Sequence, residues 1–443
     1  MLWKMISSME DKDSSSGGEM VKAIVNVRIY DFVDYIDNGY IIFDKSILEV
    51  GQMKDFNKSM ERIDGKGKIV IPGLVNFHTH LYSSLFRGLD MKTSPENFHQ
   101  VLEEIWWKYD KYLKLEDIGL AAGMYCIESL KSGVTALVDH HASGEIQGSL
   151  LVIRNVIKGH FGMKGLVCFE TSDRYDVDSC IDENVDAIKM GDGLFGLHAS
   201  MTLSEETLNQ CKERLHNTPI HIHAAESIED EDHSEKHYGI RVVERLDRHQ
   251  LLNKHSILAH CVHINELEAE IIYDRECIVA LNPSSNMNNA VGIFDYDLFR
   301  RNSINLVVGT DGLGANVAKE WQNIYYFGKQ AMNKPSGIGP DEIRYHIIKS
   351  YELFNQLTAK KTGRIMAGYD ADLLMIDYEP PTPMDESNAF GHVLFGLFDN
   401  LRPRDVFIEG EYKIKDYDLQ VAFDTNRELV DKLWKRIGGN NES

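Results

Sequence analysis

Two histidines one residue apart, His78 and His80, follow an apolar run that begins at Ile69. The run has the composition of a β-strand, broken by Pro72-Gly73, and side chains two residues apart on a strand point to the same side. Both imidazoles can therefore reach one borderline metal ion such as Zn²⁺. Alternating histidines also occur as ordinary polar positions of a half-exposed sheet, so the rest of the chain must separate the two interpretations.

Further strand-type runs along the chain also end in histidine or aspartate. The expected strands cover residues 134–139, 165–169, 194–197, 219–223, 256–259, 277–281 and 305–308. Helical stretches, most clearly residues 115–131, separate several of them, and this alternation is typical of βα units around a parallel sheet. About eight such units predict a (β/α)₈ TIM-like barrel, whose active site lies at the carboxyl ends of the strands. The polar residues expected there are His78, His80, His140, His141, His198, His221, His223, His260 and Asp311.

Four of these side chains form a plausible metal shell, namely His78, His80, His223 and Asp311. Three imidazoles and a carboxylate, with one position left for water, suit one divalent ion, Zn²⁺ first and Fe²⁺ as the alternative. Such an ion lowers the pKa of its bound water to roughly 7, so a hydroxide nucleophile is available at neutral pH.

Two further residues at strand ends can handle protons. Glu226 lies three residues beyond His223, where it can protonate a leaving nitrogen or a ring nitrogen. His260 can hold or deprotonate the attacking water, or stabilise developing negative charge. A solvated surface charge is the simpler interpretation of Glu226, but its place beside a strand end favours catalysis. His140 and His141 are adjacent, so only one can face the interior, and we expect both to be structural.

The bulk composition indicates a globular protein with a small-molecule partner. The 443 residues carry 47 Lys and Arg against 69 Asp and Glu, a net charge of -22 that disfavours nucleic acid and anionic membranes. The six cysteines form no C-x-x-C pair, which is typical of free thiols in a reducing compartment. We found no apolar run long enough for a membrane span and no secretory signal, so a cytoplasmic location is expected.

Short β-type runs separated by turn residues lie near both ends of the chain, at residues 23–29, 40–43, 46–50, 371–377 and 405–410. They predict a small β-sandwich domain built from residues 20–70 and 363–443. This domain would enclose the barrel at residues 71–362, and residues 1–19 are expected to be a disordered tail.

The chain resembles the amidohydrolase superfamily from about residue 21 to 410. The motifs that carry the resemblance are residues 72–80, 132–135, 223–226, 258–261, 309–312 and 367–373. Phe86-Arg87-Gly88, the His-x-x-Glu pair and residues 282–287 are similar to the aminohydrolase branch with guanine deaminase, S-adenosylhomocysteine deaminase and the triazine chlorohydrolases. The resemblance implies the ligand and acid–base roles given above, a proton shared between Asp311 and the metal-bound water, and a homodimer.

Two features depart from the family or are less clear. Binuclear members carry a carboxylated lysine on the fourth strand, but residues 194–198 contain no lysine, which favours one metal ion. We expect His198, Asn286 and Trp106 to line the substrate pocket, although packing in a helix core is an equal alternative for Trp106 and for Trp107.

These observations predict a metal-dependent aminohydrolase that releases ammonia from a nitrogen heterocycle such as a purine or pterin. One alternative is hydrolysis of a chloro or alkylamino substituent, or of a cyclic amide, on a similar ring. A catalytically silent binding protein is the alternative of another class, and the complete set of ligands argues against it.

Overall fold

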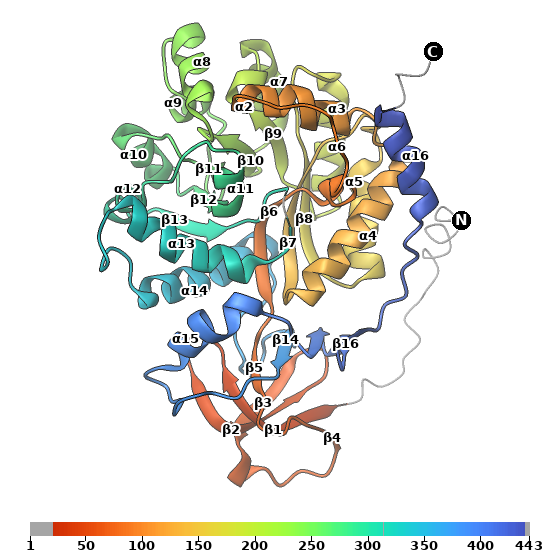
Figure 1. The fold of residues 1–443 in the computed structure, drawn as a ribbon, viewed down its shortest axis with the longest axis vertical. Coiled ribbons are helices and arrows are strands. Elements are labelled where there is room, and N and C mark those ends of the chain that lie inside the picture. Colours follow the sequence, from red (N-terminus) through yellow and green to blue (C-terminus); the bar gives the residue numbers. More distant parts are fainter. Residues whose placement is uncertain (1–20, 313, 439–443) are drawn as a thin grey trace.

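The computed structural model describes residues 21–312 and 314–438, so the predicted tail at residues 1–19 lies outside the described part. Figure 1 shows a large α/β unit above a smaller β-rich unit, with the red amino-terminal strands and the blue carboxyl-terminal strands together in the smaller one. Among the described residues, no helix is long and apolar enough to cross a membrane.

The smaller unit is a nine-stranded sheet made from both ends of the chain. Its order is β17-β16-β15-β14-β5-β1-β2-β3, with β4 paired to β1. The strands are β1 (Lys22–Tyr30), β2 (Tyr35–Phe43), β3 (Ile47–Gln52), β4 (Glu61–Asp64), β5 (Ile69–Pro72), β14 (Leu373–Ile376), β15 (Asp405–Ile408), β16 (Glu411–Lys415) and β17 (Asp418–Leu419). The antiparallel pairing of β14 with β5 joins the two ends of the chain, as the sequence predicts.

The larger unit holds two parallel sheets, with orders β6-β7-β8 and β13-β12-β11-β10-β9. Their strands are β6 (Leu74–Thr79), β7 (Val134–His141), β8 (Lys164–Phe169), β9 (Phe195–Ala199), β10 (Ile220–Ala224), β11 (Ile257–His260), β12 (Ile278–Leu281) and β13 (Asn305–Val308). Parallel bridges connect Thr79 to Asp311 and Thr171 to Leu197, so each sheet approaches the other at both edges. Nearly every strand residue is buried, which explains the continuous apolar runs in the sequence.

Helices follow the parallel strands and cover their outer side in Figure 1. They are α4 (Leu115–Lys131), α5 (Ser149–Arg154), α6 (Val177–Lys189), α7 (Glu205–Leu215), α8 (Ile228–Tyr238), α9 (Val242–Arg248), α10 (Glu266–Asp274), α12 (Tyr296–Arg301), α13 (Val317–Ala331) and α14 (Pro340–Thr358). The predicted helix at residues 115–131 is therefore confirmed. Its first turn carries Glu116 and Asp117, which complement the positive end of the helix dipole.

The Pro-Gly break lets the chain pass from one unit to the other. β5 ends at Pro72 and β6 begins at Leu74, and a Cβ at Gly73 would lie 2.2 Å from Thr135 Oγ1. Only glycine allows this close approach. The chain therefore passes from β5 of the smaller unit to β6 of the larger unit within one residue, and β6 carries His78 near its end.

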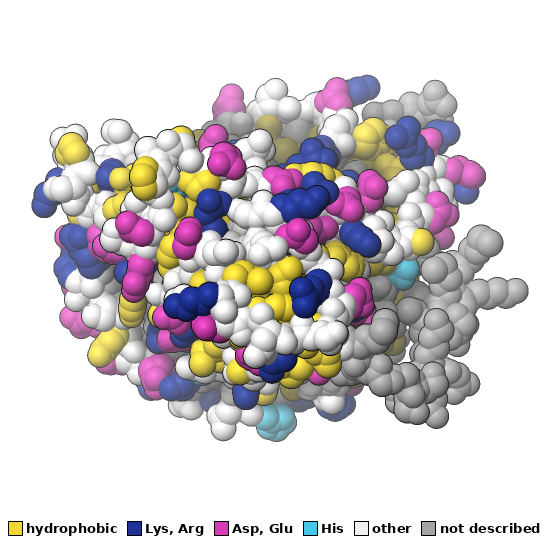
Figure 2. Space-filling view, turned by 90° about the horizontal axis from the view of Figure 1, so that it is seen from below, with side chains coloured by type: hydrophobic (Ala, Val, Ile, Leu, Met, Phe, Trp, Pro, Cys, Tyr) yellow, Lys and Arg dark blue, Asp and Glu magenta, His cyan; other side chains and the backbone are white. Residues whose placement is uncertain are grey.

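Further helices lie over the carboxyl ends of the parallel strands, beside the smaller unit (α15) and near the carboxyl terminus (α16) (Figure 1). They are α2 (Phe98–Val101), the π-helix η3 (Leu102–Trp106), α3 (Trp107–Asp110), α11 (Pro283–Asn288), α15 (Ala389–His392) and α16 (Arg427–Gly438). On the face seen from below, at the end formed by the smaller unit, acidic and basic side chains are interspersed (Figure 2). No region of a single charge sign dominates that face, in keeping with a small-molecule partner.

Candidate active site

Four side chains predicted as metal ligands converge at the carboxyl ends of β6, β10 and β13. His80 Nε2 lies 3.2 Å from His223 Nε2 and 2.9 Å from Asp311 Oδ1. His78 Nε2 lies 3.5 Å from the same Asp311 oxygen. Ligand atoms of His78, His223, His260 and Asp311 also all lie within 4.8 Å of one another. His260 is therefore close enough to hold the same ion as the predicted ligands.

Unpaired buried nitrogens show that this donor set fits a metal ion. His78 Nε2 and His260 Nε2 are buried and, among the described residues, neither has a hydrogen-bond partner. Burial lowers the pKa of His78 to about 3, so its ring is neutral, as a ligand must be. Burial also opposes the charge on His80, but the hydrogen bond to Asp311 raises its pKa to about 9. An ion bound at His80 would displace that proton.

Each of the three predicted histidine ligands is oriented through its other ring nitrogen. His80 Nδ1 lies 2.6 Å from the carbonyl oxygen of His140, and His223 Nδ1 lies 2.9 Å from that of His198. A carbonyl oxygen only accepts, so both Nδ1 atoms donate; Nε2 is the atom left to bind an ion, at His80 once the ion has displaced its proton. His78 Nδ1 is held by His221 Nε2 at 2.9 Å, which turns its Nε2 toward Asp311.

Glu226 lies beside this cluster as a buried carboxyl group. It is 7% exposed, which rules out a solvated surface charge. Its Oε2 is 3.5 Å from His260 Nε2. Burial, together with the negative charge of Asp311, raises the pKa of Glu226 well above its usual range. A carboxyl group that keeps its proton at neutral pH can serve as a general acid.

The helix α11 supports the three residues that can handle protons. Ser285 Oγ donates to Asp311 Oδ2, and Asn286 Oδ1 lies 2.7 Å from His260 Nδ1. Asn289, one residue past the helix, donates to Glu226 Oε1 at 3.4 Å. The motif at residues 282–287 thus supplies hydrogen bonds that orient His260 and Asp311. Asn286 contacts His260 and is not among the residues that line the cavity, so its substrate role stays a prediction.

Three residues at or just beyond strand ends adopt left-handed backbone conformations. The φ angles are 73° at His260, 53° at Asp311 and 49° at Ala225. Such angles are uncommon for residues other than glycine and cost of order 1–3 kcal/mol each. Such conformations therefore occur at His260 and Asp311 themselves and at Ala225, the neighbour of Glu226.

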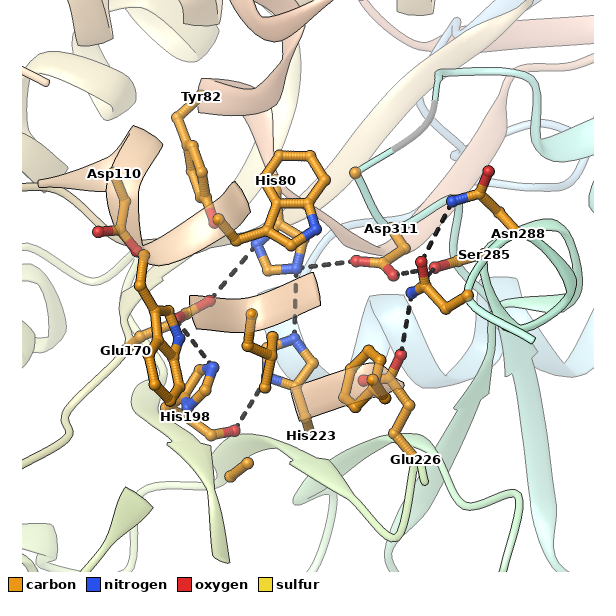
Figure 3. Close-up of a pocket in the computed structure, with 17 residues that line it drawn as sticks. His80, Tyr82, Asp110, Glu170, His198, His223, Glu226, Ser285, Asn288 and Asp311 are labelled. Carbon is orange, nitrogen blue, oxygen red and sulfur yellow. Dashed lines mark hydrogen bonds and ion pairs between the residues drawn. The ribbon is translucent and has the colours of Figure 1, made fainter. Parts of the chain in front are cut away.

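A cavity opens between these residues and α2, η3 and α3 (Figure 3). One wall carries Glu226, Ser285, Asn288, Asn289 and Asp311. The opposite wall carries Tyr82, Asp110, Glu170 and His198, while Phe98, Leu102, Trp106 and Trp107 complete the enclosure. The cavity therefore includes two of the three predicted substrate-binding residues, His198 and Trp106.

Sequence reasoning missed Glu170, which is 3% exposed. Its Oε1 lies 3.1 Å from His140 Nδ1 and 3.6 Å from His80 Nδ1. His140 Nε2 also donates to the carbonyl oxygens of Leu197 and His221, so this histidine ties three strands together. Glu170 follows β8 directly, so the rule that selected the other strand-end residues could have found it.

His141, the neighbour of His140, points away from this cluster. Its Nε2 lies 3.0 Å from Ser143 Oγ, and its ring packs against Phe169 and Tyr82. Only His140 of the adjacent pair therefore contacts the metal-ligand histidines, as the sequence argument expected.

Comparisons with known proteins agree with this site. The profile of the amidohydrolase family matches residues 69–413. A 5'-deoxyadenosine deaminase of Methanocaldococcus jannaschii is 26% identical over 416 residues, which are 88% of this chain and 93% of that protein. A 5-methylthioadenosine/S-adenosylhomocysteine deaminase of Dictyoglomus turgidum is 25% identical over 438 residues, 93% of this chain and 99% of the relative.

One solved structure shares the fold over nearly the whole chain. It is a zinc-bound adenosine deaminase from Xanthomonas campestris, with a TM-score of 0.80 and 19% sequence identity. The similarity covers 94% of this chain and 98% of that one.

Proposed function

Because this chain belongs to the amidohydrolase family, we propose that it is a metal-dependent deaminase that releases ammonia from an adenosine-derived or related nitrogen heterocycle. The observation that carries the proposal is the place of Glu226, 3.5 Å from His260 and beside the convergent histidine nitrogens. The names of the relatives, which are deaminases of deoxyadenosine and methylthioadenosine, support the same reaction.

In this proposal His78, His80, His223 and Asp311 hold one divalent ion, with zinc as the first candidate. The bound ion supplies a Lewis acid that activates water at neutral pH. Asp311 Oδ2 and His260 Nε2, 4.0 Å apart, accept and hold the proton that water gives up. Glu226 gives its proton to the ring nitrogen or to the departing amine, and His260 stabilises the negative charge that develops during the attack.

We further propose that the two parallel sheets close into one (β/α)₈ barrel over residues 71–362, and that the terminal sheet forms the β-sandwich domain of residues 20–70 and 363–443. The bridges between Thr79 and Asp311 and between Thr171 and Leu197 support closure at both edges. We also propose that the protein is a homodimer, that it is located in the cytoplasm, and that it acts in purine metabolism.

The test is ammonia release from a panel of 5'-deoxyadenosine, 5'-methylthioadenosine, S-adenosylhomocysteine, adenosine, guanine, pterins and amino-triazines. We expect ammonia from at least one purine compound, with a product mass one unit higher than the substrate mass. Metal-loaded protein that releases no ammonia from any of them would contradict the deaminase proposal. Release of chloride or alkylamine from a triazine would favour a different leaving group.

A further inference from the structure

Two hydrogen-bond acceptors lie side by side on the cavity wall opposite Glu226. Glu170 Oε2 and His198 Nε2 are 3.7 Å apart, and both side chains line the cavity (Figure 3). They are 3% and 5% exposed, so a polar group of a bound molecule would meet them with little competing water.

The neighbours of His198 decide which of its nitrogens can accept. The hydroxyl of Thr202 donates its only hydrogen to the carbonyl oxygen of Ala199, at 3.0 Å. Its oxygen therefore accepts from His198 Nδ1, at 2.8 Å. With the hydrogen on Nδ1, the Nε2 of the neutral ring presents a lone pair to the cavity.

Glu170 likewise keeps one oxygen for a ligand. Its Oε1 faces His140 and His80, at 3.1 and 3.6 Å. Its Oε2 accepts no hydrogen bond from any residue in the part of the chain that the structure describes. A carboxylate oxygen that is left unpaired in a buried site costs free energy unless a ligand supplies a donor.

We propose that Glu170 and His198 form a subsite that binds an exocyclic amino group of the substrate ring other than the one released as ammonia. The inference rests on the proposed function and narrows its substrate class. The preferred ring carries a second donor group, as a 2-amino-substituted purine does, and the subsite disfavours a carboxylate or a halide at the same place.

The two walls of the cavity flank His80. The ring of His80 separates them, with Glu170 3.6 Å from its Nδ1 and Asp311 2.9 Å from its Nε2. In the proposed subsite, a ring whose reacting carbon lies near Asp311 and Glu226 extends past His80 toward Glu170.

Trp107 covers this subsite and is itself held in place. Its ring lies 6.2 Å from that of His198, and the guanidinium of Arg174 lies 4.8 Å from its centre. Arg174 donates to Asp110 Oδ2 at 2.8 Å, which fixes the guanidinium. The indole thus supplies a rigid flat cover for an aromatic ligand.

The first experiment compares kcat/KM for 2,6-diaminopurine riboside and adenosine, which share the 6-amino leaving group. A hydrogen bond to a buried charged group predicts a preference for the diamino compound of roughly 10- to 100-fold. In Glu170→Gln we expect this ratio to fall close to one. Ammonia release from both compounds without a preference in the wild type would overturn the subsite.

Glu170 also contacts His80. Its replacement can therefore lower the reaction rate with every substrate by disturbing the proposed metal ligands. Such an effect lowers both kcat/KM values equally and leaves their ratio unchanged, and that result would overturn the proposal. The matched control is Glu183→Gln, because Glu183 is a buried carboxylate of α6 that accepts from Gly148 and Leu150 outside the cavity. The control should keep the wild-type ratio.

A second measurement needs neither turnover nor a variant. Calorimetric binding of 2-aminopurine and of unsubstituted purine to the metal-loaded wild type compares ligands that lack the leaving group. We expect 2-aminopurine to bind roughly 10-fold tighter or more. Equal affinities would overturn the subsite, whereas a preference without any ammonia release would contradict only the deaminase proposal.

Discussion

The Nε2 atoms of His80 and His223 lie 3.2 Å apart, although 142 residues separate them in the chain. Two nitrogens bound tetrahedrally to one zinc ion at 2.0–2.1 Å would be about 3.3 Å apart. Their Nδ1 atoms donate to backbone carbonyl oxygens of neighbouring strands, so the sheet itself sets this separation. The fold therefore pre-organises the site for a metal ion.

Replacing Glu226 tests its role as the proton donor. Glu226→Gln keeps the shape and the contact with Asn289 but cannot give up a proton in the same way. We expect kcat to fall by about 10²–10⁴-fold with the metal content unchanged. Kinetics beside elemental analysis of the same preparation checks this, and a fully active variant would refute the acid–base role.

Replacing His78 tests the metal shell. His78→Ala removes a proposed ligand that is completely buried, so we expect the purified protein to lose most of its metal. His221→Phe removes only the group that holds His78 Nδ1, and the expected loss of metal affinity is about 10- to 100-fold. Competition with a chelating dye measures both, and wild-type affinity in His78→Ala would exclude His78 as a ligand.

Much of the site could be predicted because parallel strands place their carboxyl ends at one edge. Spacing within a strand pairs His78 with His80, and strand order brings His223 and Asp311 to them. The helix at residues 115–131 was predictable because its periodic pattern is long and regular. The terminal sheet was predictable from short β-type runs, separated by turn residues, near both ends of the chain.

The rest depends on contacts that local sequence does not encode. The role of Asn286 as a partner of His260 follows from the way α11 packs across the strand ends, and the sequence shows only the motif. The cavity wall of Glu170, His198 and Trp107 depends on how α3 folds over β8 and β9. Both features depend on side-chain contacts between elements that are far apart in the sequence.

Gly309 allows β13 to approach β6 closely enough for Asp311 to meet His78. A Cβ there would lie 2.4 Å from Asn282 Oδ1 and 2.5 Å from the carbonyl oxygen of His78. We expect Gly309→Ala to lower the free energy of unfolding by about 1–3 kcal/mol and to weaken metal binding. Gly159→Ala, with nothing within 4 Å of the added Cβ, is the control, and equal effects of the two changes would contradict this packing argument.

A buried ion pair joins the two units of the molecule. Lys164 on β8 pairs with Asp372, which precedes β14, and both are almost fully buried. Lys164→Met removes the ammonium group that pairs with this carboxylate and leaves the carboxylate buried. We therefore expect the free energy of unfolding to fall by about 3–5 kcal/mol.

The loss of unfolding free energy caused by Lys164→Met should depend on pH. Burial raises the pKa of Asp372, and Lys164 acts against that shift. Without Lys164 the folded-state pKa rises further above the unfolded value, so the loss is full at high pH and shrinks as pH falls through the folded-state pKa. Urea unfolding at pH 8 and pH 5 tests this sign, and a loss that grows on acidification would contradict it.

The central claim is that one metal ion held by these ligands drives ammonia release, and a metal titration tests it most directly. Protein stripped by a chelator is titrated with zinc or iron(II), and ammonia release is measured at each step on a substrate found active. We predict no activity without metal and a linear recovery that reaches its maximum at one equivalent per chain. Full activity in the stripped protein, or a maximum only at two equivalents, would contradict the account.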